Sequence, residues 1–326
     1  MTPNSNAPIV ISCGEPAGIG PEVAAKAFDA LGRDVPMAYV GDPTHLPAGT
    51  RTALIDELSE VGKASGHGLP VLALAFAGSA LPGQADPANA QGVIDAITTC
   101  VDLVQRGAAR AVCTAPIHKK ALQDGAGFAY PGHTEFLQAL AGSGQAVMML
   151  ASDQLRVVPA TIHIALDQVA TQLTPDVLRS TIQITHQDLI DRFGITSPRI
   201  AIAGLNPHAG EGGAMGRQEL DWINALVNDM NNNGFNLTGP LPADTMFHAQ
   251  ARARYDAAVC MYHDQALIPI KTLDFDRGVN VTLGLPFVRT SPDHGTAFDI
   301  AGRGIANPTS MIEALKLAHK MSKDTI

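Results

Sequence analysis

Three histidines in the second half of the chain follow short apolar runs that are typical of buried strands. His163, His208 and His263 stand at or just past the carboxyl ends of VVPATIHI, RIAIAGLNPH and DAAVCMYH. Ligands of open parallel sheets bind outside the carboxyl ends of the strands, so the three imidazoles can converge. Three neutral imidazoles hold a zinc-type divalent ion and leave a position open for substrate. Taken singly, each is more simply a polar strand tip, but as a set they favour a metal site.

The elements that would position these histidines follow from hydrophobic patterning. Apolar β-rich runs alternate with longer amphipathic or Ala-rich segments, which favours parallel sheets with helices on their faces. We therefore predict an α/β fold of two α/β/α lobes. Strands are expected at 8–12, 37–41, 69–76, 109–116, 145–152, 155–164, 199–207 and 256–263, and helices at 21–31, 88–107, 175–194, 216–234 and 307–321.

Composition restricts the partners of the chain. Its 326 residues include 22 Lys or Arg and 31 Asp or Glu, for a formal net charge of -9. No excess positive field exists to hold nucleic acid or an anionic membrane, so neither partner is expected. No signal-type leader and no uninterrupted apolar run of membrane-spanning length is evident, so we expect a cytoplasmic enzyme. The four cysteines form no CxxC pair, which argues against a disulfide frame or a thiolate metal site.

The glycine-rich segments do not match the common nucleotide-binding or hydrolase motifs. No GxGxxG, GxxxxGK[ST], HExxH or GxSxG pattern occurs. The first strand runs instead into GEPAGIGPE, residues 14–22, where Gly18 and Gly20 permit a tight turn and Pro21 suits a first helical turn. By itself this segment is equally well a rigid turn that binds nothing.

A string near the C-terminus is more specific. HGTAFDIAGRGIANP, from His294 to Pro308, resembles the adenine-side loop of the isocitrate and isopropylmalate dehydrogenase superfamily, which binds NAD without the glycine fingerprint. The resemblance implies a two-domain α/β/α fold with mostly parallel sheets and an active-site cleft between the domains. It also implies cofactor contacts at His294, Gly295, Thr296, Ala297 and Asp299, with the adenine facing Asn307.

Motifs over nearly the whole chain resemble one family within that superfamily, the 4-hydroxythreonine-4-phosphate dehydrogenases of pyridoxal phosphate (vitamin B6) biosynthesis. They are GEPAGIGPE, TAPIHK, GHTEFL, GLNPHAGEGG, GPLPADTMF, MYHDQ and GVNVTLGLPFVRTS with DHGTA. The resemblance implies NAD or NADP as cofactor and a homodimer with the active site at or near the subunit interface. It implies one divalent metal per site (Zn, Mg or Co) on His163, His208 and His263, and leaves open which subunit donates which ligand. It implies substrate contacts at His133, Thr134, Lys271, Asn280 and Arg289.

These residue types suit a phosphorylated amino acid. Its anionic groups need cations, which Arg289 and Lys271 can supply. They also need directed donors, which Asn280, Thr134 and His133 can supply. Thr134 stands near the start of a predicted helix, where phosphate binds well. From local sequence alone Thr134 is equally a helix cap, and the two basic residues are more simply solvated charges.

The implied reaction is the NAD(P)-dependent, metal-dependent oxidation of 4-phosphohydroxy-L-threonine to a 2-amino-3-oxo acid, which decarboxylates to 3-amino-2-oxopropyl phosphate. A metal on the secondary hydroxyl lowers its pKa, so that a nearby base takes the proton. Lys271 is the candidate base or relay, provided that burial lowers its pKa. Asp264, beside His263, is its rival or an orienting group.

Domain boundaries, departures and alternatives complete the prediction. We place the terminal domain with the cofactor loop at 1–132 plus 275–326, and the central domain with the metal ligands and dimer contacts at 133–274. Ala214 stands where the family usually has a histidine. This difference bears on which substrate the enzyme prefers more than on the class of reaction.

One alternative function is that of a paralogous dehydrogenase acting on a threonate phosphate or a cis-diol dicarboxylate. Another is a non-catalytic metal- or nucleotide-binding protein, against which the full set of histidines and Lys271 argues.

Overall fold

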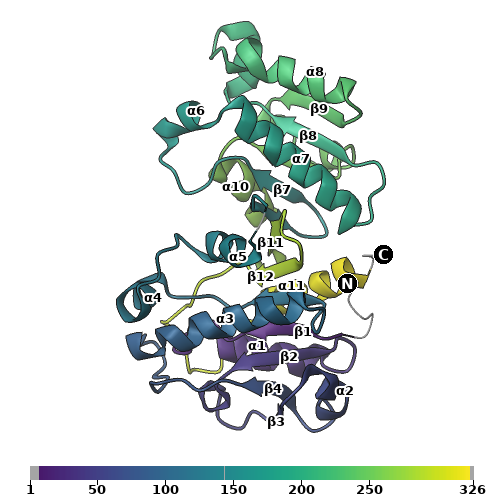
Figure 1. Cartoon of the computed structure of the whole chain (residues 1–326). Helices are drawn as coiled ribbons and strands as arrows, with labels where there is room; N and C mark the ends of the chain where they lie inside the picture. Colours follow the sequence, from purple (N-terminus) through teal and green to yellow (C-terminus); the bar gives the residue numbers. More distant parts are fainter. Residues whose placement is uncertain (1–6, 143, 324–326) are drawn as a thin grey trace. The chain divides into compact units, whose positions relative to one another are not determined.

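The computed structural model describes residues 7–142 and 144–323 and divides the chain into two compact units (Figure 1). Unit 1 is Met1–Ala146 with Leu285–Ile326, and unit 2 is Val147–Gly284. The boundaries predicted from sequence, 132/133 and 274/275, differ from these. The difference arises because helix α5 (His133–Ala141) packs against α3 (Ala90–Gln105) of unit 1, and strand β11 (Val279–Leu283) pairs with β6 (Val147–Ala151) of unit 2.

Unit 1 is a parallel sheet with helices, in the strand order β3-β4-β2-β1-β5-β12. Its strands are β1 (Ile9–Ser12), β2 (Met37–Gly41), β3 (Thr52–Ile55), β4 (Leu69–Ala73), β5 (Ala111–Thr114) and β12 (Val288–Pro292). Its helices besides α3 and α5 are α1 (Gly20–Leu31), α2 (Val61–Ala64), α4 (Lys119–Ala126) and α11 (Thr309–Lys323). These strands pair in parallel, and β1, β2, β5 and β12 are buried along their whole length, as central parallel strands are.

Helices cover the sheet of unit 1 through apolar stripes. Helix α3 buries Val93, Ile97 and Val101, spaced by four residues, and packs on β1, β2 and β5. Helix α11 packs on β5, β12 and α1. The helices predicted at 21–31, 88–107 and 307–321 are confirmed by α1, α3 and α11.

Unit 2 has a mixed sheet in the order β11-β6-β7-β10-β8-β9. Its remaining strands are β7 (Arg156–Pro159), β8 (Arg199–Ala203), β9 (Asn236–Leu241) and β10 (Ala257–Cys260). Its helices are α6 (Val169–Gln172), α7 (Pro175–Asp191), a π-helical turn (Glu219–Ile223) continued by α8 (Asn224–Asn232), α9 (Ala249–Arg252) and α10 (His263–Asp274). Strands β7, β10, β8 and β9 run parallel, whereas β11 and β6 pair antiparallel at the other edge.

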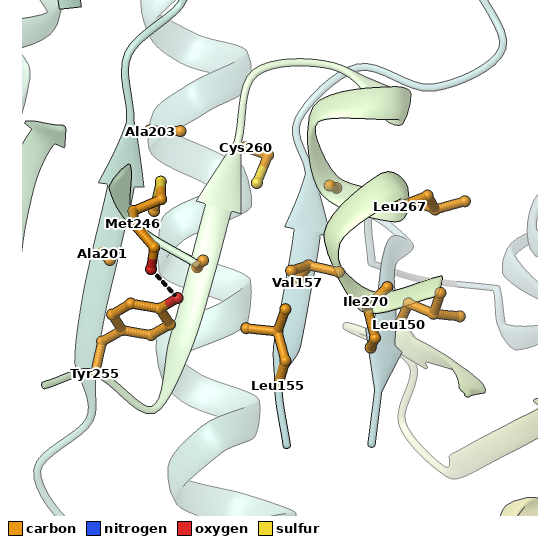
Figure 2. Close-up of a cluster of buried hydrophobic side chains, with 12 residues drawn as sticks. Leu150, Leu155, Val157, Ala201, Ala203, Met246, Tyr255, Cys260, Leu267 and Ile270 are labelled. Atoms are coloured by element: carbon orange, nitrogen blue, oxygen red, sulfur yellow. Dashed lines mark hydrogen bonds between the residues drawn. The ribbon is translucent and has the colours of Figure 1, made fainter. Parts of the chain in front are cut away.

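The core of unit 2 fixes helix α10 over its sheet. Figure 2 shows Leu267 and Ile270 of α10 beside Val157 of β7 and Leu150 of β6, all in one buried cluster. Tyr255 joins the same cluster, and its hydroxyl donates to the Met246 carbonyl at 2.8 Å. Because α10 begins at His263, this packing sets where that imidazole stands. Within the described residues, every helix is too short or too polar to cross a membrane.

Candidate functional site

The three histidines lie beyond the carboxyl ends of adjacent parallel strands of unit 2. Strand β10 lies between β7 and β8, with β7 leading to His163, β10 to His263 and β8 to His208. The predicted strands at these positions are confirmed, although β7 ends at Pro159, four residues before His163. The parallel pairing brings all three chain segments to the same edge of the sheet.

Two of the three imidazoles are neighbours. The ring centroids of His163 and His263 are 5.8 Å apart, with the planes tilted by 40°. Both rings line a pocket of about 280 Å³ that also includes Thr161, Tyr262 and Asp264. The Thr161 hydroxyl donates to the Met261 carbonyl at 2.7 Å and so ties the two ligand segments together. The pair offers two imidazole nitrogens to one ion, which is a partial fit to a zinc-type site.

His208 is presented differently. Its imidazole is 58% exposed, lies 3.5 Å from the Glu211 carboxylate and is not part of the lining of the His163 pocket. Within residues 7–142 and 144–323 of a single chain, no three His, Cys, Asp or Glu side chains are grouped to hold a metal. The three-histidine metal site therefore stays a prediction, and one chain supplies two neighbouring imidazoles toward it.

The backbone that carries His208 is strained. His208, Ala209, Gly210, Glu211 and Gly212 all have positive φ, between 41° and 81°. Each non-glycine residue in this conformation costs about 1–2 kcal/mol. Such strain persists only where the surroundings hold it, and it gathers at functional sites.

A buried carboxylate holds this turn. Glu219, at the start of the π-helical turn, is 2% exposed and accepts from the Asn206 amide at 2.8 Å and from Asn206 Nδ2 at 2.9 Å. A Cβ at Gly216 would lie 2.3 Å from Asn206 Cγ, so the side chain of Asn206 fits only against a glycine. Hydrogen bonds to a charged group contribute about 1.5–3 kcal/mol, enough to offset part of the strain.

Asp264 stands where it can orient His263. Its Oδ1 lies 2.7 Å from His263 Nδ1. A carboxylate only accepts hydrogen bonds, so Nδ1 carries the proton and Nε2 presents its lone pair for a ligand. Gln265, next along α10, donates to the Gly204 carbonyl at 2.7 Å and accepts from the Met261 amide at 2.7 Å. This side chain links the ends of β8 and β10, and the sequence analysis does not identify it.

Lys271 and Asn280 occupy other elements of unit 2. Lys271 is half-buried on α10, with Nζ 5.6 Å from the centroid of the Phe275 ring. It is not part of the lining of the histidine pocket. Asn280 is half-buried in β11, in register with Leu150 of β6. Contact of Lys271 and Asn280 with the substrate thus stays a prediction.

Unit 1 carries the remaining predicted substrate residues. Arg289 in β12 is 3% exposed and donates to Thr114 Oγ1 of β5 at 2.6 Å. Burial lowers the pKa of Arg289 to about 10, so it keeps its positive charge at neutral pH. A buried guanidinium is well suited to an oxyanion. Thr114 belongs to the TAPIHK motif and is a positioning residue that the sequence analysis does not single out.

His133 and Thr134 begin helix α5. Burial lowers the pKa of His133 well below its usual range, and the positive charges of Arg289 and Lys119 lower it further. Its Nε2 is buried without a hydrogen-bond partner in the described chain, as expected of an atom reserved for a ligand. The N-cap of α5 is Gly132 and no side chain caps it, so the alternative that Thr134 is only a helix cap is wrong. The amides of this first turn, which no side chain caps, suit an anion.

The predicted cofactor loop, residues 294–307, joins β12 to α11 within unit 1. Thr296 and Ala297 are half-buried, and Ala297 has a positive φ of 45°. His294 Nδ1 lies 2.9 Å from the Gly295 carbonyl, while its buried Nε2 has no hydrogen-bond partner in the described chain. Asp299 is exposed, and Asn307 Oδ1 accepts from the Thr309 amide and hydroxyl at 3.0 and 2.7 Å. The Asn307 side chain thus holds Thr309, the first residue of helix α11, a role that sequence alone does not assign.

Two α/β units, with imidazoles beyond the carboxyl ends of parallel strands in one and a buried guanidinium in the other, are the arrangement expected of a two-domain dehydrogenase fold. The predicted mostly parallel α/β fold class is confirmed. Residues 33–318 match the family described as "Pyridoxal phosphate biosynthetic protein PdxA", and the chain belongs to that family.

Relatives agree over the full length. A protein of Roseobacter denitrificans named 4-hydroxythreonine-4-phosphate dehydrogenase is 67% identical over 323 residues, covering 99% of both chains. The crystal structure of the Klebsiella pneumoniae protein of that name matches with a TM-score of 0.87 and 36% identity, over 97% of this chain and 100% of that one. A terephthalate 1,2-cis-dihydrodiol dehydrogenase structure from Burkholderia xenovorans matches with a TM-score of 0.67 and 25% identity, over 96% and 98%. The family resemblance seen in the sequence is confirmed, and the chain is an enzyme of the oxidoreductase class.

Proposed function

We propose that the chain oxidises 4-phosphohydroxy-L-threonine with NAD or NADP, giving a 2-amino-3-oxo acid that decarboxylates to 3-amino-2-oxopropyl phosphate. The observation that carries the proposal is the 67% identity, over 99% of both chains, to a protein named for this substrate. The proposed setting is pyridoxal phosphate biosynthesis in the cytoplasm.

The substrate phosphate and carboxylate require positive charge and directed donors. Arg289, buried and held by Thr114, offers a fixed guanidinium in unit 1. The first turn of α5 offers backbone amides together with Thr134, and His133 offers a neutral imidazole. Lys271 and Asn280 of unit 2 are proposed as further contacts.

A divalent metal ion (Zn, Mg or Co) is proposed at His163, His263 and His208. When bound, the ion supplies Lewis acidity to the substrate hydroxyl and to the enolate formed on decarboxylation. Asp264 fixes the tautomer of His263, and Thr161 holds the two neighbouring ligand segments together. Because His163 and His263 are neighbours in one chain and His208 lies outside their pocket, we propose that a homodimer completes the set.

The base that takes the hydroxyl proton is assigned to Lys271. Asp264 already accepts from His263 Nδ1, so a role in orienting this ligand suits it better than proton removal. Replacing Lys271 with Met is expected to lower kcat by about 10²-fold or more, the usual contribution of a general base. Turnover close to that of the wild type with a raised KM would make Lys271 a phosphate contact instead.

The cofactor is assigned to residues 294–307, with Gly295, Thr296, Ala297 and Asp299 along its path and Asn307 at the adenine end. The decisive assay is NADH or NADPH absorbance on adding 4-phosphohydroxy-L-threonine, with and without a chelator. Signal that depends on both substrate and metal supports the proposal, and absence of signal with metal present would remove it. An aromatic cis-diol dicarboxylate and a threonate phosphate serve as rival substrates, the first because of the 25% identical cis-dihydrodiol dehydrogenase.

A further inference from the structure

The GEPAGIGPE turn and helix α1 hold both ends of the cofactor loop. We propose that Glu22 and Lys26 are positioning residues that set the affinity of this loop for the nicotinamide cofactor. The identity of the ligand rests on the proposed function, whereas the anchoring itself rests on contacts within unit 1. Neither side chain is proposed to touch the cofactor.

The first anchor lies at the beginning of the loop. The Ile19 amide donates to the Thr296 carbonyl at 3.0 Å. A Cβ at Gly18 would lie 2.9 Å from that same oxygen, so the turn accommodates Thr296 only with glycine at this position. The glycines of the GEPAGIGPE segment therefore serve a close backbone approach, which the sequence alone leaves undecided against a plain turn.

The second anchor lies near the end of the loop. Glu22 Oε1 accepts from the Ala306 amide at 2.9 Å and from Lys26 Nζ at 2.8 Å. Lys26 Nζ also donates to the carbonyls of Gly304 at 3.0 Å and Ala306 at 2.8 Å. An ammonium group has three donors, and these three contacts use them all. One ion pair thus binds both polar groups of Ala306, about 280 residues away in the chain.

Smaller contacts hold the middle of the loop. A Cβ at Gly83 would lie 2.9 Å from the Phe298 carbonyl, and one at Gly302 would lie 2.6 Å from the Pro82 ring. Gly83 is itself tied to the first turn, because its amide donates to the Ala17 carbonyl at 2.8 Å. The middle of the loop therefore lies against Pro82 and Gly83, which the hydrogen bond to Ala17 ties to the first turn. Asp299 and Arg303 of the loop remain exposed.

The ion pair is better explained by positioning than by stability. The side chain of Glu22 is 7% exposed and that of Lys26 34% exposed, and the desolvation of such a pair offsets most of its attraction. Glu22 and Lys26 form their hydrogen bonds with the backbone of a loop that has no regular secondary structure of its own. A loop that is already ordered loses little conformational entropy when the ligand binds. Losing the anchor should therefore weaken cofactor binding and leave the chemical step unchanged.

The test compares three variants with the wild type. E22Q/K26M removes both charges together, K26M removes the cation alone, and K26R keeps a cation that can reach the carbonyls. K316M is the matched control, because it breaks an exposed Lys316–Glu313 pair on α11. Cofactor affinity is measured by calorimetry with NAD and NADP, and loop opening by tryptic cleavage after Arg303 and hydrogen exchange of the Ala306 amide.

We expect E22Q/K26M and K26M to raise the Kd and KM for the cofactor about tenfold, with kcat within about twofold. Cleavage after Arg303 should quicken about tenfold, since local opening governs proteolysis. K26R should lie between these variants and the wild type, and K316M should match the wild type. An opened loop with unchanged cofactor affinity would overturn the proposal, as would unchanged cleavage and exchange. A wild-type protein that binds neither NAD nor NADP would defeat the proposed cofactor role, and with it the affinity claim, while the cleavage data would still report the anchoring.

Discussion

At the scale of single residues, the contact between Asp264 and His263 decides which imidazole nitrogen faces the ligand. The carboxylate oxygen lies 2.7 Å from Nδ1, which leaves Nε2 as the ligand atom. Losing such an orienting group typically costs 10–100-fold in metal affinity, roughly, so we expect D264A to weaken zinc binding by about that factor. Calorimetric zinc titration measures it, with D276A on the exposed surface of the same unit as control. Equal affinities for both variants would contradict the orienting role.

His133 gives a prediction on pH. Its pKa in the folded chain lies well below the value of about 6.5 that an unfolded imidazole has. Between those two values the unfolded chain binds a proton that the folded chain does not, so the free energy of unfolding falls as the pH drops below about 6.5. We expect H133N to lose less stability than the wild type between about pH 7.5 and about pH 5.5, measured by urea unfolding. Parallel losses in both proteins would show that His133 does not contribute.

At the scale of elements, the left-handed turn after β8 depends on glycines that are not equivalent. Gly216 has φ 130° and no room for a Cβ beside Asn206, whereas Gly212 has φ 65° and nothing within 4 Å of a Cβ. We expect G216A to displace Asn206 from Glu219 and to lower the free energy of unfolding by about 2–4 kcal/mol. The control G212A should lower the free energy of unfolding by only about 1 kcal/mol, because only the positive φ is unfavourable there. Thermal or urea unfolding separates the two, and equal losses would refute the packing argument.

The elements themselves were unequally predictable. Long periodic helices such as α3 and fully buried strands such as β1 follow directly from the pattern of apolar residues. Strands β3 and β9 are largely exposed or half-buried, so their sequences show no buried apolar run. Strand β12 includes the buried Arg289. Because a charged residue interrupts the apolar pattern, the sequence does not indicate a strand here, and tertiary packing stabilises it through the hydrogen bond to Thr114.

At the scale of the whole molecule, the proposed sharing of metal ligands between subunits predicts complementation. H208A and H263A should each be inactive alone. If His163 and His263 come from one subunit and His208 from its partner, a mixed dimer has one intact site, and random mixing restores about a quarter of wild-type activity. The measurement is activity after mixing, unfolding and refolding the two variants, with size determined by light scattering. No restored activity would place all three ligands in one chain or deny the dimer.

The alternation of strands and helices, the family and the residues that can do chemistry are all readable from the chain alone, because they depend on residue type and local order. Which of these residues meet depends on the three-dimensional packing. His163 and His263 become neighbours because β7 pairs with β10, and Glu22 reaches Ala306 because α1 packs on α11. Residues that are one hundred or more positions apart are brought together by strand order and helix packing, which arise from the collective burial of many side chains and leave no local pattern.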